Sequence, residues 1–133
     1  MSTFTRIEAA LRAKWTSVYV RILAIVLACG ALAHLANMLG LSGASWSQSP
    51  AAWRLMDVTL LLFNLTVGAG LWWRRVWAVV ALVAGMFSLQ LVPYTVFRAH
   101  FAVTPEHAQT LDALLATEGL LIGILVLLIA LKK

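Results

Sequence analysis

Four long apolar segments dominate the pattern of hydrophobic and polar positions along the chain. They run at about residues 16–39, 52–73, 76–97 and 109–131. Each reaches the roughly 20 mostly apolar residues that a helix needs to cross the hydrocarbon core of a bilayer. The connections are short and polar, as in the Ser- and Gly-rich residues 40–51. The pattern therefore predicts an all-α integral membrane protein: an antiparallel four-helix bundle forming a single transmembrane domain over residues 1–133.

A short amphipathic segment precedes the first apolar one. Ile7, Ala10 and Leu11 recur at helical spacing among basic residues, which favours a helix lying at the membrane interface. The run Thr5-Arg-Ile-Glu8 fits a capping box, in which the Thr and Glu side chains satisfy free amides at a helix start. We therefore expect a short N-terminal interfacial helix that runs into the first span.

The composition agrees with a membrane protein and excludes several other classes. Of the 133 residues, 62% are hydrophobic and 11% are charged, whereas soluble domains average about 45–50% apolar and about 25% charged residues. The mean hydropathy is +0.92. A soluble fold of this length could not hide so much apolar surface. These values exclude an ordinary soluble enzyme, a disordered chain and a nucleic-acid-binding module.

The basic residues lie mainly at the ends of the apolar segments, and their distribution predicts an orientation. With four spans, one side of the membrane receives Arg6, Arg12, Lys14, Arg21, Arg74, Arg75, Lys132 and Lys133. The other side receives only Arg54 and Arg98. The positive-inside rule then predicts a multi-pass protein of a bacterial inner membrane with both termini in the cytoplasm.

Each predicted span carries polar side chains inside the membrane. At a rise of about 1.5 Å per residue, they fall at similar depths in the outer half, whereas the inner half is almost purely aliphatic. The residues concerned are His34, Asn37, Asp57, Gln90, Tyr94 and Glu118. Because lipid cannot satisfy such groups, they should face the interior of the bundle. We expect an outward-facing polar pocket, with Arg54 and Arg98 at its mouth.

Several functions are compatible with such a pocket. A lipid-soluble ligand such as a quinone can place a carbonyl against His34, Gln90 or Tyr94. Alternatively, His34, Asp57 and Glu118 supply the ligand types for Zn, Mn or non-haem Fe, which would suit a metal-dependent membrane enzyme or a small oxidoreductase. Buried carboxylates also serve in proton paths, but few polar residues continue into the inner half.

A purely structural role is a further alternative. Asp57 can pair with Arg54, and Glu118 with Arg98, so that the polar layer only fixes how the helices pack. In such a protein the pocket residues would have no ligand, and the chain would serve as a structural subunit of a larger membrane complex.

Catalysis by the chain alone has little support in the sequence. No serine lies in a Gly-x-Ser-x-Gly setting, and the single cysteine, Cys29, has no adjacent base. A bundle this small exposes a large surface to the lipid bilayer, so we expect an accessory or binding role beside other membrane subunits or further copies. Gly119-x-x-x-Gly123 permits close approach of a neighbouring helix, within the bundle or between chains.

Some short stretches resemble the DoxX-like group of small bacterial membrane proteins. They are Arg21-Ile-Leu-Ala24 and Cys29-Gly30-Ala31 in the first span, and Gly68-Ala-Gly-Leu-Trp-Trp-Arg-Arg75 at the end of the second. The resemblance implies four spans with both ends cytoplasmic. Because some members are membrane subunits of quinone-linked oxidoreductases, it also implies a quinone-linked role. His34 stands where that group often carries a lysine, and no site residue is carried over.

Overall fold

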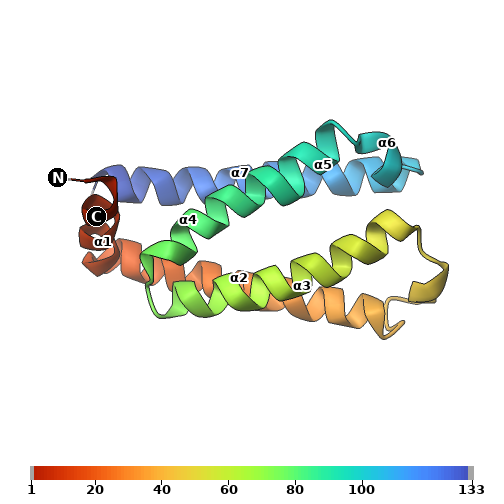
Figure 1. Ribbon diagram of the computed structural model, residues 1–133, viewed down its shortest axis with the longest axis horizontal. Helices are drawn as coiled ribbons and strands as arrows, with labels where there is room; N and C mark the ends of the chain where they lie inside the picture. The colour runs from red at the N-terminus through yellow and green to blue at the C-terminus, as the bar shows by residue number, and fades with distance from the viewer. Residues whose placement is uncertain (1, 132–133) are drawn as a thin grey trace.

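The computed structural model describes residues 2–131, and these residues form an all-α bundle without strands. In chain order the elements are α1 (Thr3–Arg12), α2 (Lys14–Met38), the short 3-10 helix η1 (Trp46–Gln48), α3 (Ala51–Trp72), α4 (Val76–Gly85), the π-helix η2 (Met86–Leu91), α5 (Val92–Thr95), α6 (Arg98–Phe101) and α7 (Pro105–Leu131). The segments α4, η2 and α5 follow one another as a single rod (Figure 1). The all-α prediction is confirmed.

Four helical segments are long and apolar enough to cross a membrane. They are Lys14–Met38, Ala51–Trp72, Val76–Thr95 and Pro105–Leu131. Successive segments run in opposite directions, so α1, the α3–α4 turn and the C-terminal end of α7 lie at one end of the bundle (Figure 1). We call this the α1 end, and we call the opposite end, with residues 39–50 and α6, the loop end. The antiparallel four-helix bundle is confirmed.

The helix α1 lies across the α1 end of the bundle instead of extending α2 (Figure 1). Ala13 has an extended backbone, with φ −67° and ψ 144°, and separates the two helices. Ala10 and Leu11 are buried, and Leu11 belongs to the main apolar core. The amphipathic stripe of α1 therefore packs against the other helices of the bundle.

The predicted capping box is wrong, because α1 begins one residue after Ser2 and uses that hydroxyl as its cap. Ser2 Oγ accepts a hydrogen bond from the backbone N–H of Thr5 at 3.3 Å. Glu8 instead pairs with Arg12 on the exposed face, at 2.8 Å. Ser2 lies about one turn before Thr5, the cap that the sequence suggested, and its hydroxyl likewise accepts a hydrogen bond from a free backbone N–H.

Apolar side chains fill the half of the bundle nearest α1. This cluster joins α1, α2, α3, α4 and α7, and its buried members are Leu11, Val20, Leu23, Ala24, Val67, Leu71, Ala78, Val79, Leu82 and Leu125. A smaller cluster occupies the loop end and consists of Met56, Leu60, Tyr94, Phe101 and Leu111. The polar side chains of the spans lie in the loop-end half, where Tyr94 itself belongs to the smaller cluster.

The third span departs from regular α-helix at Met86–Leu91, where it forms π turns. Pro93 lies two residues after these turns, and it has no N–H to donate to the carbonyl of Leu89, four residues earlier. Interrupted helix ladders are common sites of π turns. The altered pitch leaves Gln90 and Tyr94 both buried, with 8% and 1% of their surface exposed.

The glycines of the spans differ in what surrounds them. A Cβ added to Gly85 would collide with the ring of Phe63 on α3. At Gly119 the nearest such atom is Met86 Cε at 4.0 Å, and at Gly123 no described atom lies within 4 Å. Gly119 and Gly123 therefore play no part in close packing within the bundle.

Candidate functional site

A cavity of about 480 Å³ lies among all four spans in the half of the bundle towards the loop end. We call it the main cavity. Its polar lining comes from His34 on α2, Trp53, Asp57 and Asn64 on α3, Gln90 on η2, Tyr94 on α5, and Thr110, Thr117 and Glu118 on α7. The remaining wall is largely aliphatic, with Val26, Leu27, Leu60, Leu114 and Leu121 among its residues. A cavity of this kind combines apolar walls with a few polar groups.

Most of the pocket residues expected from the sequence line this one cavity: His34, Asp57, Gln90, Tyr94 and Glu118. Asn37 instead lines a second cavity, of about 250 Å³, beneath residues 42–50. We call it the loop cavity. Trp53, Asp57 and Thr110 line both cavities, so these three side chains stand between the main cavity and the loop.

Asp57 is buried, with 6% of its surface exposed, and it is surrounded by hydrogen-bond donors. The Nδ1 atom of His34 lies 2.8 Å from its Oδ1, and Asn37 Nδ2 donates to the same oxygen over a long 3.5 Å. The indole Nε1 of Trp46 donates to Oδ2 at 3.0 Å. A buried carboxylate requires such partners, and here both oxygens are satisfied.

Asp57 pairs with His34, and not with Arg54 as the structural alternative expected. The Arg54 guanidinium lies over the ring of Trp46, 6.0 Å from its centre. Trp46 belongs to η1, so its bond to Asp57 fastens residues 39–50 to α3. The Asp57 carboxylate therefore joins α2, α3 and the loop.

Arg98 pairs with Asp112 at 2.9 Å and donates to the carbonyl of Ala108 at 3.2 Å. It thus holds α6 to the start of α7 and does not pair with Glu118. Neither Arg54 nor Arg98 is among the described residues that line the main cavity.

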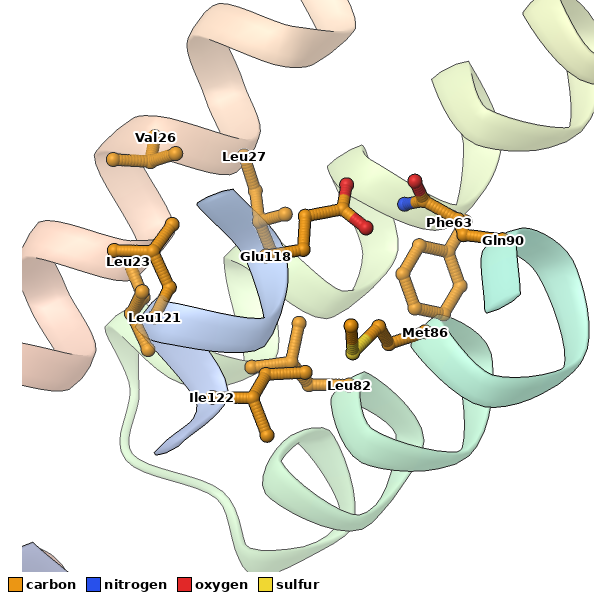
Figure 2. Close-up of a pocket in the computed structure, with 10 residues that line it drawn as sticks. All are labelled: Leu23, Val26, Leu27, Phe63, Leu82, Met86, Gln90, Glu118, Leu121 and Ile122. Atoms are coloured by element: carbon orange, nitrogen blue, oxygen red, sulfur yellow. The ribbon is translucent and has the colours of Figure 1, made fainter. Parts of the chain in front are cut away.

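Glu118 has no set of donors like that of Asp57. Its Oε2 atom is buried and has no hydrogen-bond partner among the described residues. Figure 2 shows its carboxyl group pointing towards the side-chain amide of Gln90, with the apolar side chains of Leu82, Met86 and Ile122 below it. These residues enclose a further space of about 70 Å³, which shares Gln90 and Glu118 with the main cavity.

The three side chains of the metal hypothesis do not form a metal centre. His34 and Asp57 are paired, but no three His, Cys, Asp or Glu side chains within residues 2–131 are grouped so as to hold a metal ion. Glu118 lies beside Gln90, on the floor of the cavity.

The sequence interpretation left out several polar residues of the main cavity. Thr110 and Thr117 are seven residues apart, and Thr117 adjoins Glu118, so their spacing places all three towards one side of α7. Asn64 lies seven residues after Asp57 on α3 and is buried. Trp53 Nε1 donates to the carbonyl of Phe101 at 3.0 Å, a contact that no local spacing could indicate.

Comparison with known proteins does not assign the chain to a family. No protein-family model gives a significant match, and neither the curated proteins nor the solved structures contain one. The chemistry of the main cavity itself is therefore the basis for the function.

Proposed function

We propose that this chain is a small multi-pass membrane protein that binds a lipid-soluble or amphiphilic ligand in the main cavity. In this proposal it is a binding or accessory subunit and not an enzyme by itself. The observation that carries the proposal is the convergence of polar side chains from all four spans on a space of about 480 Å³. Known small-molecule pockets measure about 300–1,000 Å³ and have this mixture of apolar wall and few polar groups.

The lining supports a ligand that is held by hydrogen bonds at one end. Tyr94 carries a hydroxyl and Gln90 a carboxamide, and both are buried in the wall. His34 uses Nδ1 for Asp57, which leaves Nε2 for another group. A quinone carbonyl is one partner that such donors can take, and the resemblance to the DoxX-like group favours a quinone-linked complex.

The distribution of basic residues supports an orientation in a bacterial inner membrane. Arg6, Arg12, Lys14, Arg21, Arg74 and Arg75 lie towards the α1 end; Lys132 and Lys133 lie outside the described residues. The loop end carries Arg54 and Arg98. By the positive-inside rule the α1 end faces the cytoplasm, so the main cavity lies in the outer half of the membrane.

The exposure of α7 supports association with other membrane subunits or a second copy. It has the smallest buried share of the four spans, and its Gly119 and Gly123 have no close neighbour within the described bundle. Small residues in such positions let another helix approach closely.

The ligand can be identified directly from the protein as it is produced. The full chain is purified in a mild detergent, extracted with organic solvent, and the extract is analysed by mass spectrometry. We expect one lipid-soluble compound to co-purify at a fixed ratio to the protein. A cavity that is empty in every preparation would contradict the proposal.

A matched pair of variants ties that compound to the main cavity. Thr117→Trp places a large ring at a residue that lines the cavity, and the compound should be lost. Ala116→Trp puts the same ring on the adjacent residue of α7, which is exposed and does not line the main cavity, and the compound should be retained. Equal retention by both variants would place the ligand elsewhere.

A further inference from the structure

The charged groups around the main cavity are not balanced. Among its described lining residues, Asp57 and Glu118 are acidic and none is Lys or Arg. Asp57 already has His34, Trp46 and Asn37 as donors. The carboxyl group of Glu118 faces a neutral amide, and its Oε2 has no partner in the described structure.

Among residues 2–131, the two basic side chains of the loop end contact groups other than Glu118. Arg98 is held by Asp112 and by the carbonyl of Ala108. Arg54 lies over the ring of Trp46. An unpaired carboxylate inside a membrane bundle is costly, and such groups are usually paired. A cationic group on the ligand would supply a partner for Glu118 that the described residues do not.

We propose that the main cavity takes an amphiphilic amine, with its protonated nitrogen at Oε2 of Glu118 and its apolar body against the aliphatic wall. The inference rests on the proposed function and specifies the charge of the ligand. An ammonium group donates the hydrogen bond that this oxygen lacks and also supplies the missing positive charge. A quinone carbonyl only accepts hydrogen bonds, so it would leave Oε2 without a donor.

The rest of the cavity fits the same ligand. Leu60, Leu114 and Leu121 form part of the wall and suit an alkyl or aryl body. The rings of Trp53 and Tyr94 also line the space, and aromatic faces attract ammonium groups.

The experiment compares three probes that differ in their polar group: phenylbutylamine, phenylbutanol and phenylbutyrate. Binding of each to the full chain in detergent is measured by isothermal titration calorimetry at neutral pH. We expect the amine to bind about tenfold or more tighter than the alcohol, as one charge-assisted hydrogen bond allows. The carboxylate should bind weakest.

Two isosteric variants identify the carboxylate responsible. Glu118→Gln should remove the advantage of the amine and leave the affinity for the alcohol unchanged. Glu106→Gln removes an exposed carboxylate near the start of the same helix and should alter neither affinity.

The possible results separate this inference from the proposed function. If the unmodified chain binds the amine and the alcohol equally, the inference is overturned and the proposed function stands. If none of the three probes binds, both are overturned. The inference is also overturned if the amine still binds more tightly than the alcohol in Glu118→Gln but no longer does so in Glu106→Gln.

Discussion

The two acidic side chains of the main cavity have different surroundings, although they belong to one layer of the bundle. Asp57 accepts hydrogen bonds from side chains of α2 and of the loop, so its charge is compensated within the protein. Glu118 leaves one oxygen unpaired. Asp57 therefore contributes mainly to holding the helices and the loop together, whereas Glu118 is the residue that the proposed ligand would contact.

Replacement of Asp57 by Asn should destabilise the bundle. An amide retains one acceptor oxygen and presents an NH₂ group where Trp46 or His34 donates, so at least one buried donor loses its partner. The expected loss is about 2–3 kcal/mol of unfolding free energy, measured by denaturant titration in detergent. Asp112→Asn is the control, because this carboxylate is exposed and its pair with Arg98 contributes at most about 1 kcal/mol. Equal losses in the two variants would contradict this role.

At the residue scale, the sequence predicts the polar layer better than the contacts within it. The cost of polar groups in lipid is a local property of each span, so His34, Asp57, Gln90, Tyr94 and Glu118 could be placed at one depth. Which of them pair depends on helix rotation and on the path of the loop. The bond from Trp46 to Asp57 could not be predicted, since a tryptophan near a span end is equally suited to the membrane interface.

At the scale of elements, glycines allow α3 and α4 to approach closely, Gly70 near the turn and Gly85 at the far end of α4. Gly85 lies against the ring of Phe63 and comes directly before the π turns that carry Gln90. Any side chain there would push α4 away from α3 or displace Phe63, which also lines the small space below Glu118. The position of η2 is therefore tied to this contact.

Gly85→Ala should destabilise the bundle by about 1–3 kcal/mol, the usual cost of an overpacked core. Gly123→Ala is the matched control in α7, where an added methyl group meets no described neighbour within 4 Å, and it should cause no loss. Thermal unfolding of the two variants in the same detergent tests the difference. A larger loss for Gly123→Ala would mean that this residue packs against another chain.

The elements themselves were largely predictable, and their boundaries were less so. Hydrophobic length identifies the helices, because a bilayer sets the number of residues needed to cross it. The break at Ala13 has no such local cause: it lets Leu11 reach the core shared by α2, α3, α4 and α7. Likewise, Pro93 marks an interruption of the third span, but the sequence does not indicate that the break takes the form of π turns at Met86–Leu91.

At the scale of the whole molecule, most of the described basic residues and the main cavity lie towards opposite ends. The basic residues gather around α1 and the α3–α4 turn, and the polar layer lies towards the loops. If the basic α1 end faces the cytoplasm, as proposed, the polar layer lies in the outer half of the membrane.

A topology experiment tests the orientation. Alkaline phosphatase, which is active only outside the cytoplasm, is fused after Gly43 in the loop or after Leu131 at the end of α7. We expect activity from the Gly43 fusion alone, because the basic residues of the α1 end should remain in the cytoplasm. Activity from the Leu131 fusion would reverse the orientation and place the cavity in the inner half of the membrane.

The apolar core near α1 adjoins the main cavity on the side away from the loops. Leu11, Val20, Leu71 and Leu125 are almost completely buried there. If the proposed ligand binds at Glu118, close-packed aliphatic side chains would separate it from the α1 end, which fits binding or hand-over to a neighbouring subunit.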